Sequence, residues 1–280
     1  MRIIDIQTPF SAPVYHMEST TSTFDIARQL AINNEPHGTV ICADFQTAGR
    51  GRQNRRWLAD KGMNLLFTIL LRYENINSIP EALTLRTGLV VSLAIEDLVS
   101  DLTRTALANP TLTGLVLVKW PNDVIITNPS LGVMRKVSGI LTESDGKNVY
   151  IGVGINVAQT EFSDESNAAL NCKAGSITQF LAEGSPALNE NARFILLEKF
   201  LSRLYAEIEC PDSAVSWRTR LCKRLYKLGE PVIFAHGAID SGNLIKGKLS
   251  GIGNQGELLI IPEGTNTEIP FITGELQVKY

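Results

Sequence analysis

The stretch VYIGVGINV, residues 149–157, alternates strictly between aliphatic residues and smaller or polar ones. A β-strand turns successive side chains to opposite faces, so the aliphatic residues share one face while Gly152, Gly154 and Asn156 share the other. We expect the aliphatic face to lie on a core and the glycine face to form a smooth floor. Two interpretations of that floor stay open, because glycines in strands mark either a ligand or closely packed protein.

Apolar periodicity around this strand predicts the other elements. Strands are expected at 38–45, 64–71, 115–118, 124–126 and 137–142, and helices at 24–33, at 80–102 and over most of 173–226. The helix at 80–102 is apolar nearly all round, with one stripe through Leu85 and Leu89 and a second through Val91 and Ile95, which indicates burial on several sides. The strand at 115–118 is wholly apolar, and we expect it at the centre of its sheet.

The sequence changes in character after Gly229, where short strands alternate with Gly-Asn and Gln-Gly turns. This pattern predicts a small β-barrel. The fold class is therefore α+β, with a mixed β-sheet covered by helices and a small C-terminal β-barrel. We place the larger domain at residues 1–226 and the barrel at residues 227–280.

Composition restricts the classes of function. The 280 residues are 44% hydrophobic and carry a net charge of −3, which argues against a general nucleic-acid binder. No apolar run reaches the roughly 20 residues that span a bilayer, and the start has no signal-peptide core, so we expect a cytoplasmic protein without a membrane partner. The four cysteines form no CxxC pair and no HExxH is present, which argues against a zinc site.

A loop rich in arginine and glycine follows the strand at 38–45. The run QTAGRGRQNRRW, residues 46–57, places four arginines in seven positions and interleaves Gly49 and Gly51 with them. Guanidinium groups bind phosphate or carboxylate through two hydrogen bonds, and glycine lets the backbone approach a ligand. The loop suits a small anion that reacts and leaves. A solvated basic loop, or a patch for nucleic acid, is the alternative.

Two further segments carry polar groups at strand ends. KWPND, residues 119–123, surrounds a strand break, where catalytic groups are often found. Lys136 precedes the strand expected beside the glycine floor and could reach into a cleft as a point charge, although an ordinary exposed lysine is the alternative. The sequence contains no GxxxxGK[ST], no GxSxG and no EF-hand loop.

Together these motifs resemble the biotin protein ligase family, in the order in which that family shows them. QTAGRGRQNRRW is similar to its biotin and adenylate loop, and KWPND, KVSGIL (136–141) and GVGIN (152–156) follow. STFDIA (22–27) resembles the start of the family's first helix, with Phe24 where the family usually has Asn. Ser19-Thr20 offers a rival to Ser22-Thr23 as the Ser-Thr pair. The resemblance implies a catalytic domain of the type found in class II aminoacyl-tRNA synthetases, with an SH3-like C-terminal barrel.

The resemblance also implies roles for individual residues. Lys136, Arg50 and Arg52 would be catalytic. Biotin would be held by Ser22, Thr23, Gln46, Gly49, Arg50, Arg52, Lys136 and Gly139. The nucleotide would be held by Arg55, Trp57, Asn122, Asp123 and Asn156, with Asp123 also serving magnesium.

The implied activity is a two-step ligation that uses ATP and Mg²⁺. Biotin would be activated as biotinyl-5′-AMP and passed to a lysine of a biotin carboxyl carrier protein. Rival functions are a lipoate ligase or octanoyl transferase of the same fold, a biotin-binding protein without chemistry, and, less favoured, a nucleic-acid binder. No helix-turn-helix fits before the first motif, so we expect no DNA-binding role. A homodimer is compatible with the sequence, which does not fix the oligomeric state.

Overall fold

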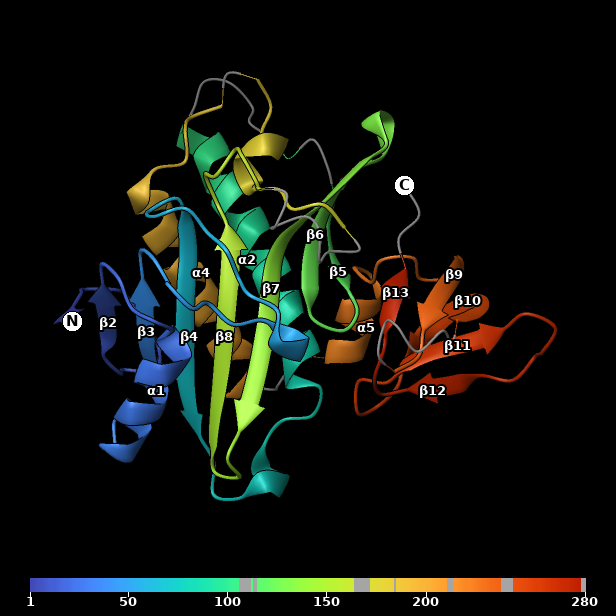
Figure 1. The fold of residues 1–280 in the computed structure, drawn as a ribbon, viewed down its shortest axis with the longest axis horizontal. Coiled ribbons are helices and arrows are strands. Elements are labelled where there is room, and N and C mark those ends of the chain that lie inside the picture. Colours follow the sequence, from blue (N-terminus) through green and yellow to red (C-terminus); the bar gives the residue numbers. More distant parts are fainter. Residues whose placement is uncertain are drawn as a thin grey trace.

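The computed structural model describes residues 1–105, 112, 115–163, 172–183, 185–210, 214–237 and 244–277. A large mixed sheet carries helices on both faces, and a smaller antiparallel sheet lies beside one edge of it (Figure 1). The strands of the large sheet are β1 (Arg2–Ile3), β2 (Val14–Met17), β3 (Thr39–Ala43), β4 (Asn64–Arg72), β5 (Leu115–Lys119), β6 (Asp123–Asn128), β7 (Val133–Ser144) and β8 (Asn148–Asn156). The expected α+β fold class is confirmed.

The strand that contains the glycine floor lies in the middle of this sheet. The strand order is β1-β2-β3-β4-β8-β7-β6-β5, in which β2 and β3 pair in parallel and the other neighbours pair antiparallel. β8 pairs with β4 along its whole length and with β7, so that Gly154 faces Gly139 across the ladder. The aliphatic face of β8 lies in the main core, as its alternation predicts.

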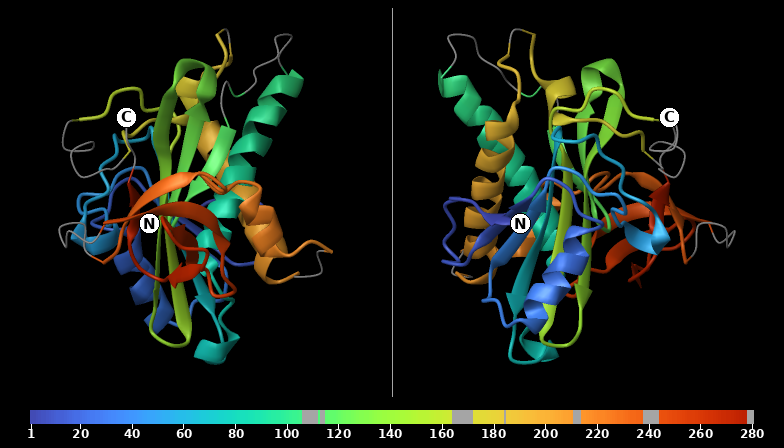
Figure 2. Two further views of the ribbon diagram at one scale, coloured as in Figure 1. Left: turned by 90° about the vertical axis from the view of Figure 1, so that its right-hand side faces the viewer. Right: turned by 60° about the vertical axis from the view of Figure 1, so that its left-hand side comes forward.

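Helices cover the two faces of the sheet unequally (Figure 2). The helices are α1 (Thr23–Ile32), α2 (Leu83–Thr105), α4 (Glu190–Ile208) and α5 (Trp217–Cys222), with single 3₁₀ turns η1 (Arg52–Asn54), η2 (Ile76–Ser78), η3 (Pro129–Leu131) and η4 (Ile177–Phe180). α2 and α4 pack together on the aliphatic face of β8. α1 packs against β3, β4 and β8 on the opposite face, which it covers only in part.

The C-terminal sheet packs on α2 and on the end of β5. Its strands are β9 (Pro231–Ala235), β10 (Leu244–Ile252), β11 (Leu258–Pro262), β12 (Ile269–Phe271) and β13 (Glu275–Gln277), in the order β12-β11-β10-β9-β13. The two apolar stripes of α2 separate here: Val91 and Ile95 lie in the main core, while Leu85 and Leu89 join the core of the C-terminal sheet. Trp120 is buried in that second core.

The expectation that the strand at 115–118 is central was wrong. β5 is the outermost strand of the large sheet and pairs only with β6 among the named strands. Its free edge is occupied by the chain that leads to the C-terminal sheet: the Val118 amide donates to the Arg224 carbonyl and the Tyr226 amide donates to the Val118 carbonyl. β5 is apolar because α2 and the C-terminal core bury it, and not because strands flank it.

Residues 127–134 form the tip of the β6–β7 hairpin around η3. Most of residues 103–114 lie outside the described residues. Within the described residues, no helix is both long and apolar enough to cross a bilayer.

Candidate active site

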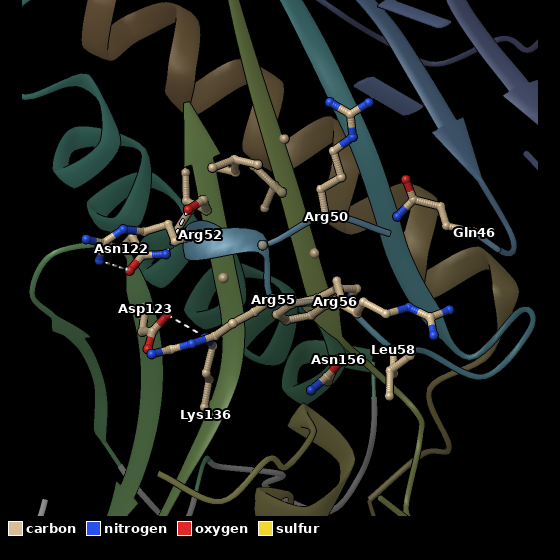
Figure 3. A pocket seen from close by; sticks show the side chains of 18 of the residues that line it. Gln46, Arg50, Arg52, Arg55, Arg56, Leu58, Asn122, Asp123, Lys136 and Asn156 are labelled. Atoms are coloured by element: carbon tan, nitrogen blue, oxygen red, sulfur yellow. Dashed lines mark hydrogen bonds and ion pairs between the residues drawn. The ribbon is translucent and has the colours of Figure 1, made fainter. Parts of the chain in front are cut away.

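A pocket lies on the glycine face of the sheet, beside α1 and beneath the arginine-rich loop (Figure 3). Its walls come from the start of α1, the loop at 46–58, strands β6, β7 and β8, and Glu275 of β13. Its lining includes Ser22, Thr23, Phe24, Gln46, Arg50, Arg52, Arg55, Trp57, Lys119, Asn122, Asp123, Lys136, Gly139, Asn156 and Glu275.

The glycine floor is covered by two aromatic rings. A Cβ atom at Gly152 would lie 2.1 Å from the Phe24 ring, and one at Gly154 would lie 2.4 Å from the Trp57 ring. Trp57 would also meet a Cβ at Gly139, on the neighbouring strand, at 2.8 Å. Protein therefore packs closely over both glycines, and the same glycines also line the pocket. Both interpretations of the floor apply, because Trp57 belongs to the loop that roofs the site.

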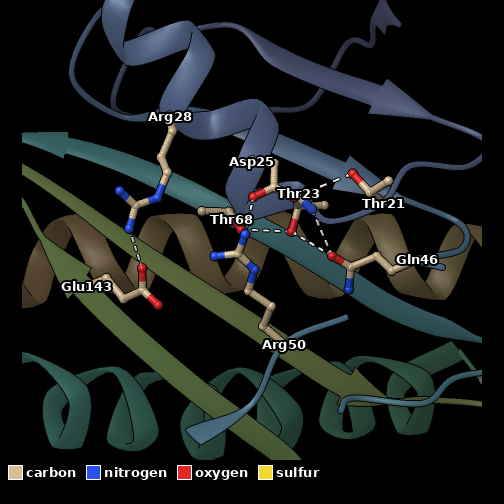
Figure 4. Close-up of polar contacts among 8 residues, drawn as sticks. All are labelled: Thr21, Thr23, Asp25, Arg28, Gln46, Arg50, Thr68 and Glu143. Atoms are coloured by element: carbon tan, nitrogen blue, oxygen red, sulfur yellow. Dashed lines mark hydrogen bonds and ion pairs between the residues drawn. The ribbon is translucent and has the colours of Figure 1, made fainter. Parts of the chain in front are cut away.

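One end of the pocket is polar and carries no net charge, because the Arg50 guanidinium that lines it is paired with Asp25 (Figure 4). Ser22 is the N-cap of α1, but its hydroxyl makes no capping hydrogen bond, and its Oγ is buried with no partner among the described residues. The Gln46 side-chain oxygen instead accepts hydrogen bonds from the Thr23 amide at 2.8 Å and from the Thr23 hydroxyl at 3.1 Å. The Thr68 hydroxyl oxygen lies 2.8 Å from the Thr23 hydroxyl oxygen. The first free amide of the helix is thus satisfied, while Ser22 retains a hydroxyl for a ligand.

The other end of the pocket is cationic. Lys136 Nζ lies 2.6 Å from Asp123 Oδ1, and the two residues come from neighbouring strands, β7 and β6. The Arg52 guanidinium donates to Asn122 Oδ1 at 3.1 Å, and the Asn122 amide nitrogen donates in turn to the Ile140 carbonyl. Figure 3 shows Arg52, Asn122, Asp123 and Lys136 gathered on one side of the pocket, opposite Gln46. Such an end would attract an anion.

Burial affects the charge of Arg52. Removal from water lowers the pKa of its guanidinium, and the nearby carboxylates of Asp123 and Glu275 act in the opposite direction. An arginine side chain begins from so high a pKa that it remains protonated near neutral pH. Arg52 is therefore a permanent and partly desolvated positive charge, and interactions between such a charge and a phosphate or carboxylate are stronger than in open water.

The arginine-rich loop folds back on itself as a short hairpin. The Gly51 amide donates to the Arg55 carbonyl at 2.7 Å, and the Trp57 amide donates to the Gly49 carbonyl at 3.0 Å. Its tip bends through left-handed backbone at Gln53 and Asn54, whose φ angles are 55° and 60°. The hairpin turns the Trp57 ring toward the floor, and a Cβ at Gly49 would lie only 2.5 Å from the Trp57 carbonyl oxygen.

Ion pairs hold this hairpin at two places, one on each side of the pocket. Arg50 pairs with Asp25 of α1, and these side chains are 42% and 36% exposed (Figure 4). Arg55 pairs with Glu275 of β13 at 3.1 Å, and Lys119, which is 1% exposed, lies 4.0 Å from the same carboxylate. The first contact is solvated, whereas the second joins two cations to a mostly buried carboxylate contributed by the C-terminal sheet.

Buried polar atoms of the pocket are left without partners. In the part of the chain that the structure describes, Trp57 Nε1 and Asn156 Oδ1 have no hydrogen-bond partner, in addition to Ser22 Oγ. Asn156 is held in place by its other amide atom, which donates to the Gly175 carbonyl at 2.9 Å. Buried polar groups are nearly always paired in folded proteins, so these three atoms are available to a bound ligand.

The structure brings almost all of the expected site residues together. The exception is Gly49, which does not line the pocket and whose role is to let the hairpin pack against Trp57. Of the two Ser-Thr pairs, Ser22 and Thr23 line the pocket. Thr20 forms an isolated parallel bridge with Gln46 instead.

Sequence reasoning missed several residues of the site. Glu275 is a single acidic residue in a strand far along the chain, and no pattern in the sequence points to it. Asp25 and Lys119 stand inside segments that the motifs had already marked, although no role was expected for either. Phe24 was noticeable only as a departure from the family's motif, and its ring contact with Gly152 had no sequence signal.

Comparison with known proteins identifies relatives of this chain. The sequence profile of the "Biotin/lipoate A/B protein ligase family" matches residues 16–156, which contain every expected site residue. A "Bifunctional ligase/repressor BirA" of Bacillus subtilis is 35% identical over 159 residues, which cover 54% of this chain and 43% of that protein. A "Biotin--[acetyl-CoA-carboxylase] ligase" of Mycobacterium tuberculosis is 29% identical and aligns over 72% of this chain and 63% of its own length.

Solved structures extend the likeness to the C-terminal sheet. A mutant biotin protein ligase from Aquifex aeolicus, in complex with biotin, superposes with a TM-score of 0.67 at 27% identity, covering 95% of this chain and 98% of the other. The chain spans less than half the length of the Bacillus relative. The profile match covers half of the chain, and the chain belongs to the biotin/lipoate A/B protein ligase family.

Proposed function

We propose that this chain is an ATP-dependent biotin ligase, which forms biotinyl-5′-AMP and transfers biotin to a lysine of a biotin carboxyl carrier protein. The observation that carries the proposal is the polarity of one pocket, with hydroxyl and amide groups at one end of a glycine floor and cations at the other. A neutral polar ring with an acidic tail fits that arrangement. Similar solved proteins are described in complex with biotin and with biotin and ATP.

In the first step the biotin carboxylate attacks the α-phosphorus of ATP. A carboxylate oxygen–phosphorus bond forms, the bond to the β-phosphate bridging oxygen breaks, and pyrophosphate leaves. Two anions must approach each other, so the protein has to supply positive charge and positioning. Arg52 and Lys136 lie at the cationic end and would serve this purpose. Because Lys136 pairs with Asp123 before any ligand arrives, a phosphate or carboxylate oxygen has to share or replace that contact.

Asp123 also suits the magnesium that accompanies ATP. Its carboxylate lines the pocket at the end where phosphates would lie. No group of three or more His, Cys, Asp or Glu side chains that could hold a metal occurs among the described residues. A lone carboxylate fits Mg²⁺, which commonly keeps several waters and binds one or two carboxylates together with substrate phosphates. Bound there, the ion would neutralise phosphate charge.

In the second step the amine of a carrier lysine attacks the carbonyl carbon of the mixed anhydride. An amide bond forms and AMP leaves with the electrons of the broken anhydride bond. The hairpin and Trp57 cover the floor and would protect the intermediate from water before the carrier arrives. The carrier is proposed from the similar proteins named as biotin--[acetyl-CoA-carboxylase] ligases.

Pyrophosphate release tests the proposal directly. The purified chain is incubated with ATP and Mg²⁺, and biotin, lipoate or octanoate is added in separate reactions. Release with biotin, followed by labelling of an added carrier domain, is the expected result. Release with lipoate or octanoate alone would assign the chain to the other branch of its family. Binding of biotin without release would identify a binding protein that does no chemistry.

A further inference from the structure

We propose that Phe24 determines which acids the pocket accepts, by closing the glycine floor at the end that receives the ring of the substrate. This inference rests on the proposed function and extends it to selectivity. Phe24 is the second residue of α1 and is buried, and it both lines the pocket and belongs to the core cluster between α1 and the sheet. One side chain thus links the packing of α1 to the shape of the site.

The position of the Phe24 ring limits the usable length of the floor. Gly152 and Gly154 are successive residues on the same face of β8, which places them about 7 Å apart along the strand. The Phe24 ring occupies the space over Gly152, and the Trp57 ring occupies the space over Gly154. Trp57 belongs to the hairpin held by ion pairs, whereas Phe24 is fixed in a helix. Phe24 is therefore a boundary set by the packing of α1, and Trp57 is a cover supplied by the hairpin.

Charge determines which part of the substrate meets Phe24. A carboxylate that has to react with a phosphate belongs at the end with Arg52 and Lys136. The opposite end holds Thr23 and Gln46, and the charge of Arg50 beside them is balanced by its ion pair with Asp25. The Phe24 ring lies over Gly152, and the residue opposite Gly152 on β4 is Thr68, which contacts the Thr23 hydroxyl. The neutral head of the acid would therefore meet this ring. A wider head, or a longer apolar tail, would have to enter the space that this ring fills.

Removing the ring should therefore broaden selectivity. In Phe24→Ala the space over Gly152 opens. Acids with a larger or longer apolar end can then make contacts in this space, whereas biotin loses its contact with the aromatic ring. A difference of about one methylene group in an apolar pocket changes kcat/KM by roughly 10-fold or more. We expect the preference for biotin over octanoate and over lipoate, measured as the ratio of kcat/KM values for pyrophosphate release, to fall by at least about 10-fold.

Matched variants distinguish a specific effect of Phe24 on substrate selectivity from a general effect of removing a core side chain. Leu30→Ala also removes a buried apolar side chain from α1 and from the same core cluster, but Leu30 does not line the pocket. Leu30→Ala should lower the melting temperature and leave the ratio of kcat/KM values for biotin and the other acids unchanged. Phe24→Leu keeps most of the volume and should give an intermediate ratio, and it preserves the test if the alanine variant does not fold.

The outcomes separate this inference from the proposed function. Broadened selectivity in the Phe24 variants, with Leu30→Ala unchanged, supports it. Wild-type activity with biotin together with an unaltered ratio in Phe24→Leu and Phe24→Ala would overturn the inference and leave the ligase function intact. Calorimetric titration with each acid in the absence of ATP gives a second readout. A wild-type chain that neither binds nor activates any of the acids would overturn both.

Discussion

The two ends of the pocket differ in which groups their polar side chains are paired with. At the neutral end, Thr23, Gln46 and Thr68 form a connected set of hydrogen bonds that fixes the start of α1. At the cationic end, Lys136 is paired with a carboxylate that a bound nucleotide and its metal would also approach. The neutral end is therefore preorganised for a ligand, whereas the cationic end must rearrange when one binds.

This difference predicts which kinetic constant each end controls. Groups that bind the acid equally in the ground state and the transition state change KM, whereas groups that meet charge as it develops change kcat. Substitutions at the neutral end should therefore raise the KM for biotin. Substitutions at the cationic end should lower the rate of adenylation.

The largest effect is expected for Lys136→Ala. Loss of this cation should slow adenylate formation by more than about 100-fold, which corresponds to roughly 3 kcal/mol of transition-state stabilisation. Single-turnover release of pyrophosphate measures the step. Lys147→Ala, at an exposed position in the β7–β8 turn, is the matched control and should behave as wild type. Normal adenylation kinetics in Lys136→Ala would remove this lysine from the mechanism.

A smaller effect is expected for Glu275→Gln, and it should appear in stability. Without the Glu275 carboxylate, the buried ammonium group of Lys119 has less negative charge near it, and Arg55 loses its ion pair with β13. Breaking a buried pair can cost roughly 3–5 kcal/mol, but the 4.0 Å separation and the partial exposure of Arg55 reduce the expected loss to about 2 kcal/mol. Denaturant unfolding measures it.

The exposed residue Glu268, directly before β12, offers a control, since Glu268→Gln should leave stability unchanged. Saturating ATP should restore part of the stability lost in Glu275→Gln, because phosphates would take the place of the missing carboxylate beside the two cations. Equal stability of the two glutamine variants would show that the Glu275 contacts contribute nothing.

At the neutral end, Gln46→Ala should raise the KM for biotin by about 10-fold and change kcat by less than about 2-fold. The variant leaves the Thr23 amide without its acceptor and loosens the wall that meets the ring of the acid. Steady-state pyrophosphate release at varied biotin concentration gives both constants. Gln29→Ala, on the exposed side of α1, is the comparison. A fall in kcat equal to the fall in kcat/KM would contradict the division between the two ends.

The smallest effect is expected for Asp25→Asn. Its ion pair with Arg50 is exposed, and such pairs contribute up to about 1 kcal/mol. Adenylation should change by less than about 3-fold, and the difference should vanish at high salt, where exposed charges are screened. A rate loss as large as that of Lys136→Ala would mean that the solvated ion pair, and not the buried one, holds the hairpin in its working position.

Local patterns were sufficient to predict β3 to β8, helices α1, α2 and α4, and most of the residues that line the pocket. β1 and β2 were not expected, and residues 173–189, which were expected to be mostly helical, contain only the 3₁₀ turn η4 among the described residues. β8 alternates with period two, and its aliphatic face does lie in the core. KWPND joins the paired strands β5 and β6, and Lys136 lies in β7 beside β6, so the topology of the sheet brings these two segments together. The Arg-Gly loop leaves β3 and reaches them by folding over the face of the sheet. These features depend on residues near each other in sequence or on a register that one strand imposes on the next.

Features that depend on distant parts of the chain could not be predicted in this way. β5 has the composition of a central strand, yet a helix and the C-terminal core bury it at the edge of the sheet. Trp120 stands in a motif of polar groups, but its ring packs in the C-terminal core and its Nε1 donates to the Gly256 carbonyl. Glu275 reaches the site from the last described strand. Each outcome follows from where the C-terminal sheet docks.

The sealed edge of β5 has a consequence for making shortened versions of the protein. Residues 224–226 use the backbone groups of Val118 that would otherwise be open to a neighbouring molecule, and the C-terminal core covers Trp120. A chain cut before residue 224 would expose an apolar sheet edge beside an uncovered indole ring. Exposed edges of this kind recruit strands from other molecules. Such a fragment should precipitate on expression, even though it retains nearly every residue of the pocket.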